Sequence, residues 1–231
     1  MWTGQNVTNA SSLLSGFPVV NVSGPAAGGA AGGYDVGRAS FGARLTATGV
    51  SGDIMPVSVD TVNGDGCLPF NAANTLAVNG NIALLSRGVC GFTIKVKNAQ
   101  NAGAIGVIVQ DNVAGSPPPD LGGTDNTITI PAVRVTLADG ARIRAALTKR
   151  SRTKSGVIAN LTTDPTRIAG LNGGFVQLYA PNPFIGGSSV SHFDVTAYPN
   201  MLMEPNINGD LTHHVIPPDD MTFTLLTDIG W

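Results

Sequence analysis

The stretch that decides the fold is RGVCGFTIKVKNAQNAGA, residues 87–104. Its apolar residues recur at the spacing of one helix face, and these are Phe92, Val96, Ala99 and Ala102. Gly103 follows the last of them, at a position where glycine commonly ends a helix. The pattern predicts a helix over residues 91–103, with Lys95 away from the apolar face.

Strand and helix patterns alternate on both sides of this helix. Short apolar runs predict strands at 81–88, 104–111 and 127–135. Thr136 is placed to cap a second helix that ends at about residue 147, with an acidic residue three positions on, as in a capping box. Right-handed crossovers between such elements make part of the sheet parallel, with helices packed on it.

The composition is typical of a loop-rich, β-leaning globular protein. The chain has 231 residues, 42% of them hydrophobic, so it can bury a core of one large domain or one medium domain with an appendage. Charged residues make up only 12%, and the net charge is −2, which does not indicate a binder of nucleic acid or of a membrane surface. No apolar stretch is long enough to span a bilayer. The cations at 149–156 are interpreted as a solvated loop, because no aromatic or groove-forming partner accompanies them in the sequence.

The chain has two cysteines, Cys67 and Cys90. In a low-charge chain rich in Asn, Thr and Gly, such a pair favours a disulfide and an exported protein. Two unpaired core residues are the alternative, and a zinc site lacks a nearby partner Cys or His. The polar start of the chain is not a signal peptide, so we expect the signal to lie upstream of Met1 and the chain to be a fragment.

The opening stretch also carries the run R-G-x-C-x-F-x-x-K-x-x-N-A-x-x-A-G-A, whose residues are Arg87, Gly88, Cys90, Phe92, Lys95, Asn98, Ala99, Ala102, Gly103 and Ala104. With an upstream cysteine and a downstream apolar strand, residues 20–163 resemble the protease-associated (PA) domain. The resemblance implies an α/β, β-rich fold, an open β body with two packed helices, and a Cys67–Cys90 bridge. It implies no catalytic residues, but binding of peptide segments or gating of substrate access in secreted peptidases and sorting receptors.

Three residues of this region are candidates for peptide binding, namely Arg87, Asp111 and Asn112. Asp111 and Asn112 follow a predicted buried strand, where loop-borne binding groups often lie. Ordinary turn chemistry of Asx residues is the alternative. Arg87 and Lys95 either contact a peptide or are solvated.

The tail holds two further motifs, SSVSHFD at 188–194 and MLMEP at 201–205. They resemble the third-histidine segment and the methionine turn of leishmanolysin-like metzincin zinc peptidases. The resemblance implies that His192 is a third zinc ligand and that Met203 is the turn methionine, with Phe193 in place of the usual Trp. An ordinary hydrogen-bonded loop histidine is the alternative.

A catalytic zinc site needs more than this tail provides. Zincins use three protein ligands and a general base, and the chain has no H-E-x-x-H. His213 and His214 are poor partners for His192, because neighbouring side chains of an extended chain point different ways. Glu204 is interpreted as a structural or solvated residue beside the turn. No catalytic residue is therefore expected in this chain.

These observations predict a fragment of a secreted zinc metallopeptidase. Residues 1–19 would be left from a preceding catalytic domain, 20–163 the PA domain, and 164–231 a loop-rich, metallopeptidase-like subdomain ending in a short helix. Zinc would belong to the full-length parent and not to this chain alone. The expected partners are peptide or protein substrate segments and the upstream catalytic domain, with neither nucleic acid nor a membrane span. The alternative is a non-catalytic, stand-alone PA module that binds proteins.

Overall fold

The computed structural model describes residues 1–57, 64–206, 211, 214–217 and 219–231, and the chain divides into two compact units. Unit 2 is Pro18–Thr163, and unit 1 consists of Met1–Phe17 together with Asp164–Trp231. Unit 2 is thus an insertion in the sequence of unit 1. The N-terminal segment and the tail, which the sequence analysis treats separately, share one unit.

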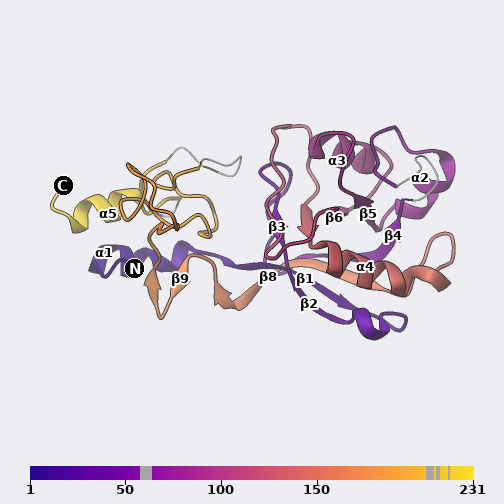
Figure 1. Ribbon diagram of the computed structural model, residues 1–231, viewed down its shortest axis with the longest axis horizontal. Coiled ribbons are helices and arrows are strands. Elements are labelled where there is room, and N and C mark those ends of the chain that lie inside the picture. The colour runs from indigo at the N-terminus through magenta and orange to yellow at the C-terminus, as the bar shows by residue number, and fades with distance from the viewer. Residues whose placement is uncertain (58–63, 207–210, 212–213, 218) are drawn as a thin grey trace. The chain divides into compact units, whose positions relative to one another are not determined.

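The largest feature of the fold is an eight-stranded sheet in the order β2-β1-β8-β4-β5-β6-β7-β3. Most of its strands are labelled in Figure 1. Its strands are β1 Gly16–Ser23, β2 Gly32–Asp35, β3 Gly37–Arg38, β4 Val50–Pro56, β5 Ile82–Ser86, β6 Gly106–Gln110, β7 Ala132–Val135 and β8 Ile158–Ile168. Strands β4 to β7 are parallel, with Ile54 opposite Ile82 and Val107 opposite Ala132. Strands β2, β3 and β8 pair antiparallel with β1, β7 and β4. The predicted mixed α/β, β-rich fold is confirmed.

Helices cover both faces of the parallel strands. They are α2 Ala72–Val78, α3 Phe92–Asn101 and α4 Leu137–Ala146, with 3-10 turns at Gly28–Ala30 and Leu147–Lys149. Successive strand residues point to opposite faces, so Leu84 packs with Ile143 of α4, whereas Leu85 packs with Val96 of α3. The predicted helices α3 and α4 are present, but α2 is a third helix that the sequence analysis did not predict.

Two local predictions were wrong in part. The strand predicted at 127–135 forms only over Ala132–Val135, immediately after Pro131, which has no N–H to donate to a ladder. Lys95 is completely buried rather than on an outer face. Its Nζ donates to the backbone oxygen of Asp65 at 2.5 Å and to Cys67 Sγ at 3.3 Å, so those acceptors offset the cost of burying the cation.

Unit 1 has short elements and a smaller core. It contains α1 Gln5–Ala10, a 3-10 turn at Ser11–Leu13, the hairpin of β9 Leu171–Asn172 with β10 Phe175–Val176, and α5 Thr222–Asp228. The core consists of Val7, Leu14, Val176, Phe193, Ala197, Met201, Met221 and Leu225. The short helix predicted at the end of the chain is α5. None of the described helices is long and apolar enough to cross a bilayer.

The two ends of the chain are joined within unit 1 by the carboxylate of Asp228. It accepts hydrogen bonds from Trp2 Nε1 at 2.9 Å, from the Asn6 N–H at 2.9 Å and from the Val7 N–H at 3.1 Å. These backbone donors belong to the first turn of α1, where N–H groups have no partner inside the helix. A Cβ on Gly4 would lie 2.1 Å from Asp228 Oδ2, so glycine allows this close approach.

Candidate functional site

The carboxyl ends of β5 and β6 carry the three residues that the sequence offers as candidates for peptide binding. In parallel sheets, ligands bind outside these ends of the strands. Arg87 follows β5 and its N–H donates to the Gln110 oxygen at 2.8 Å. Asp111 follows β6 and its N–H donates to the Val135 oxygen at 3.0 Å. The sheet therefore holds Arg87, Asp111 and Asn112 at one edge.

Asp111 is buried, and its carboxylate accepts hydrogen bonds from other groups of the protein. Oδ1 accepts from Arg87 Nη1 at 2.9 Å and from the Asn112 N–H at 2.7 Å, and Oδ2 accepts from Arg134 Nη2. Burial raises the pKa of Asp111, but the hydrogen bonds from Arg87 and Arg134 outweigh it and leave the pKa lowered. Two arginines against one carboxylate leave this cluster with an excess positive charge. Arg87 is partly exposed, whereas Arg134 is not.

Residues 87–90 form a loop, the Val89 loop, that is fixed at its base by a disulfide and exposed at its tip. A disulfide joins Cys67 to Cys90, as the resemblance to the PA domain implies. Between Arg87 and Cys90, Val89 has φ 67° and is 84% exposed. A β-branched residue in this left-handed region is strained, and such strain is found preferentially at binding sites. Asn112 is exposed next to this loop, since a Cβ on Gly88 would lie 3.5 Å from its Nδ2.

A second group of polar residues lies at the same strand ends, on the opposite face of the sheet. Ser86 and Gln110 are paired in the sheet, and Arg144 of α4 donates to both, from Nη2 at 3.0 Å and from Nε at 2.5 Å. Burial lowers the pKa of the Arg144 guanidinium, and no carboxylate pairs with it among the described residues. Neither Arg134 nor Arg144 was predicted from the sequence as a site residue. A cation inside the apolar strand AVRV, residues 132–135, was the available signal for Arg134.

The tail residues His192 and Met203 lie in unit 1, on segments that are hydrogen bonded to each other. The N–H of Phe193 donates to the Met203 oxygen at 2.8 Å. The turn at 201–205 is fixed by two buried carboxylates, because Glu204 Oε1 accepts from the Met201 N–H and Asp220 Oδ2 accepts from the Leu202 N–H, both at 2.7 Å. Glu204 thus has the structural role that the sequence suggests.

The described residues do not make up a zinc site. No group of three His, Cys, Asp or Glu side chains among them could hold a metal ion. His192 is half-buried, and its Nδ1 lies 3.0 Å from Ser191 Oγ. His214 Nδ1 pairs with Asp219 Oδ2 at 2.6 Å, and His213 lies outside the described residues. A single imidazole does not fit catalytic zinc.

Comparison with known proteins identifies the central part of unit 2. Residues 50–143 match the model of the PA domain family. A probable lipoprotein aminopeptidase of Mycobacterium tuberculosis is 32% identical over 96 residues, 42% of this chain and 19% of that protein. A minor extracellular protease of Bacillus subtilis is 33% identical over 78 residues, 34% of this chain and 9% of that protein. The chain therefore spans less than a fifth of the length of these two relatives.

A solved zinc aminopeptidase from Bacillus subtilis is similar at 22% identity, with a TM-score of 0.41 over 68% of this chain and 36% of that one. The matched family segment, residues 50–143, runs from β4 to α4. It includes the disulfide, the Val89 loop and the Arg87–Asp111–Arg134 cluster. Residues 50–143 of this chain are a PA domain.

Proposed function

We propose that the PA domain binds extended peptide segments at the carboxyl ends of β5 to β7, and so presents substrate to a peptidase or gates its access. The observation that carries this proposal is the Val89 loop. It is a strained, highly exposed apolar tip on a backbone fixed by the Cys67–Cys90 disulfide. A fixed loop loses little conformational entropy when a peptide binds.

The residues around this loop offer what an extended peptide needs. Leu68, Val89 and Val113 are each more than half exposed. Leu68 and Val89 adjoin the two disulfide cysteines, and the Val113 N–H donates to Asp111 Oδ1 at 3.2 Å. The Arg87 guanidinium and the Asn112 amide offer side-chain donors beside them. Alternate side chains of a peptide strand point to opposite sides, so one set can contact the apolar tips while its backbone meets the polar groups.

Peptide titrations of the whole chain, followed by amide chemical shifts, test the proposal. We expect saturable shifts confined to residues 64–68, 87–91 and 111–113. Arg87→Gln should weaken binding about tenfold, because one charge-assisted hydrogen bond is lost. Arg142→Gln on the outer side of α4 is the matched control and should leave the affinity unchanged. Unperturbed amides in these three segments, across a diverse peptide pool, would refute the site.

We further propose that the chain is part of an exported zinc metallopeptidase. The disulfide favours an oxidising compartment. In the full-length parent, His192 would be the third zinc ligand and Met203 the turn methionine beside an H-E-x-x-H helix that this chain lacks. The Phe193–Met203 hydrogen bond supports this proposal, because it holds the histidine segment against the methionine turn. This chain alone is expected to cleave no peptide.

The coding sequence upstream of the Met1 codon tests that proposal. An in-frame H-E-x-x-H helix preceded by a signal peptide is the expected result. The longer protein should then lose zinc on His192→Ala, as measured by bound metal per chain. A stop codon directly ahead of Met1 would instead leave a stand-alone PA module. The proposed peptide site on the PA domain is tested separately, by the peptide titrations described above.

A further inference from the structure

A second surface of unit 2 lies at the other end of β5. It is a groove of about 410 Å³, a volume within the range of ligand pockets. One wall is the exposed side of α2, with Ala72, Ala73 and Leu76. The other wall carries Arg150 and Arg152. Leu76 is 50% exposed, so the groove has an apolar side open to solvent.

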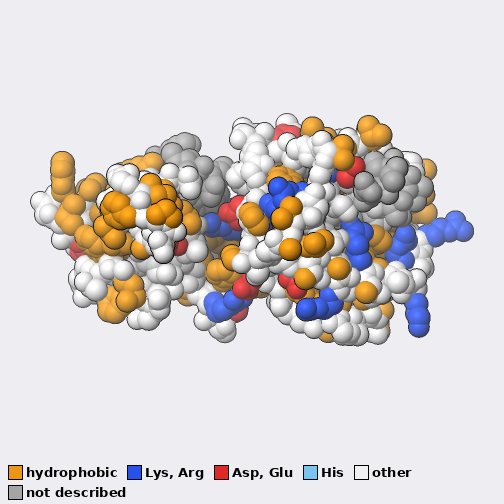
Figure 2. All heavy atoms as spheres, viewed as in Figure 1, with side chains coloured by type: hydrophobic (Ala, Val, Ile, Leu, Met, Phe, Trp, Pro, Cys, Tyr) orange, Lys and Arg blue, Asp and Glu red, His pale blue; other side chains and the backbone are white. Residues whose placement is uncertain are grey.

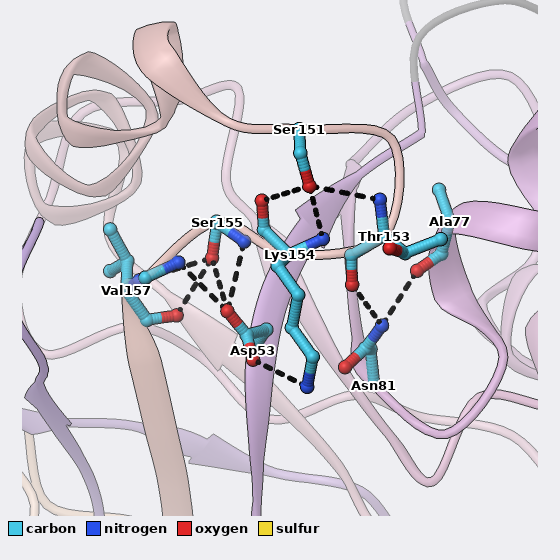
Figure 3. A network of polar contacts seen from close by, with 9 residues as sticks. Asp53, Ala77, Asn81, Ser151, Thr153, Lys154, Ser155 and Val157 are labelled. Carbon is cyan, nitrogen blue, oxygen red and sulfur yellow. Dashed lines mark hydrogen bonds and ion pairs between the residues drawn. The ribbon is translucent and has the colours of Figure 1, made fainter.

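The wall with the arginines is a fixed loop rather than a free one (Figure 3). Ser151 Oγ accepts from the Lys154 N–H at 3.0 Å. Asp53 Oδ1 accepts from the N–H groups of Ser155 and Gly156, both at 2.8 Å. Burial raises the pKa of Asp53, but these backbone hydrogen bonds outweigh it and leave the pKa lowered. The loop is therefore anchored to β4 by a carboxylate that stays ionised.

The same loop is fastened to the helix that forms the apolar wall. Asn81 Nδ2 donates to the Thr153 oxygen at 3.1 Å and to the Ala77 oxygen in the last turn of α2 at 2.8 Å (Figure 3). Asn81 immediately precedes β5, whereas Arg87 immediately follows it. The groove and the Val89 loop thus lie near opposite ends of one strand.

One wall of the groove is positively charged and the other wall is uncharged. Residues 149–154 contain four cations and no acid, and α2 contains no charged residue. Lys and Arg side chains gather around the α2 end of unit 2 (Figure 2). Lys154 pairs with Asp53 at 3.2 Å, but no carboxylate pairs with Arg150 or Arg152 among the described residues. The interpretation of 149–156 as a plain solvated loop is therefore incomplete, because α2 supplies the groove-forming partner.

From this juxtaposition we propose that the groove between α2 and Arg150–Arg152 is a second peptide site, which binds an acidic segment of a protein partner. An apolar side chain of that segment packs on Ala73 and Leu76, and a neighbouring carboxylate pairs with the two guanidinium groups. Arginine binds carboxylates with two parallel hydrogen bonds, which fixes the orientation of the bound segment. None of the described residues that line the groove is an aromatic on which a base could stack, so its chemistry favours a peptide over a nucleic acid.

Two blocked tetrapeptides serve as probes of the whole chain, Glu-Leu-Glu-Leu and its neutral counterpart Gln-Leu-Gln-Leu. The acidic peptide should shift the amides of α2 and of residues 150–153, whereas the neutral peptide should bind at least about fivefold more weakly. Arg150→Gln combined with Arg152→Gln should reduce the affinity for the acidic peptide by a similar factor. Arg142→Gln removes one charge outside the groove and should have no effect.

A second pair of variants tests the groove without removing an arginine. Ala73 is exposed on α2, so Ala73→Glu and Ala73→Gln should both fold. Ala73→Glu should bind the acidic peptide more weakly than Ala73→Gln does, because only the former adds a like charge. Equal binding of the two tetrapeptides would overturn the proposal. So would shifts at residues 87–113 instead of α2, or shifts of α2 by a single-stranded oligonucleotide and not by the acidic peptide.

Discussion

Units 1 and 2 use carboxylates in different ways. In unit 2, Asp53 within β4 and Asp111 after β6 accept from backbone N–H groups and also pair with cations, on a sheet whose two faces are covered by large apolar clusters. In unit 1, the buried Asp220 and Glu204 and the half-buried Asp228 accept mainly from backbone N–H groups, around a core of eight buried residues. Polar contacts in unit 2 shape a surface, whereas in unit 1 they replace missing secondary structure.

The exposed apolar side chains sharpen this contrast. Phe184, Val190 and Trp231 of unit 1 are 62–84% exposed, although the unit is the smaller of the two. In unit 2, exposed apolar residues such as Val89 and Leu76 lie at the two surfaces where we propose peptide binding. Apolar exposure in unit 2 therefore has a proposed use in this chain. In unit 1 it agrees with the proposal that further chain completes the unit.

The largest effect is expected from Asp111→Ala in unit 2. The substitution leaves Arg134 buried without its anion, which should lower the free energy of unfolding by about 3–5 kcal/mol. Far-UV circular dichroism during urea unfolding measures the sheet and helices. Fluorescence of Trp2 and Trp231, the two tryptophans, measures unit 1. Arg87→Gln, which removes the partly exposed partner, should cost far less. Equal losses for both variants would contradict the central role of Asp111.

Lowering the pH should reduce the free energy of unfolding of each unit through its own carboxylates. The loss should be smaller than that caused by Asp111→Ala. The pKa values of Asp111 and Asp228 are both lowered from 3.8, since hydrogen bonds to each outweigh the opposite effect of burial. The stabilisation is therefore present above the unfolded-state pKa and is lost as the pH falls through the folded-state pKa. Asp111→Asn should flatten the acid branch of stability seen by circular dichroism. Asp228→Asn should flatten the acid branch seen by tryptophan fluorescence. If each substitution changed only the signal of the other unit, both assignments would be contradicted.

Next in size is the loss of the contact that joins the chain ends in unit 1. Asp228→Ala removes the acceptor of two N–H groups in the first turn of α1 and should cost about 1–2 kcal/mol, as other N-terminal caps do. Thr136→Ala removes the cap of α4 in unit 2, where Thr136 Oγ1 accepts from the Asp139 N–H, and should cost about 1 kcal/mol. Urea midpoints read by fluorescence and by circular dichroism, respectively, compare the two. A larger cost in unit 2 would contradict the view that unit 1 depends more on such contacts.

The sequence predicts unit 2 better than unit 1 for a physical reason. Helix and strand patterns are visible where a continuous sheet buries them, as in α3, β6 and the Thr136 cap of α4. Helix α1 was not predicted, because it carries one buried residue and takes its cap from Asp228, far away in the sequence. The groove was missed likewise, because Asn81 brings α2 and residues 150–153 together only in the folded chain. Long-range polar contacts leave no local pattern in a sequence.

The smallest expected effect concerns a strained backbone position, which each unit has at one exposed valine. Val89 of unit 2 and Val190 of unit 1 have φ values of 67° and 59°, and both are largely exposed. Replacement by glycine relieves the strain but gives the unfolded chain more freedom. The Cys67–Cys90 crosslink already restricts the unfolded chain beside residue 89, so Val89→Gly should stabilise by about 1 kcal/mol and Val190→Gly by less. Reduction of the disulfide should remove this difference. If Val89→Gly also weakens peptide binding, its side chain contacts the ligand, and the strain is a cost of presenting it.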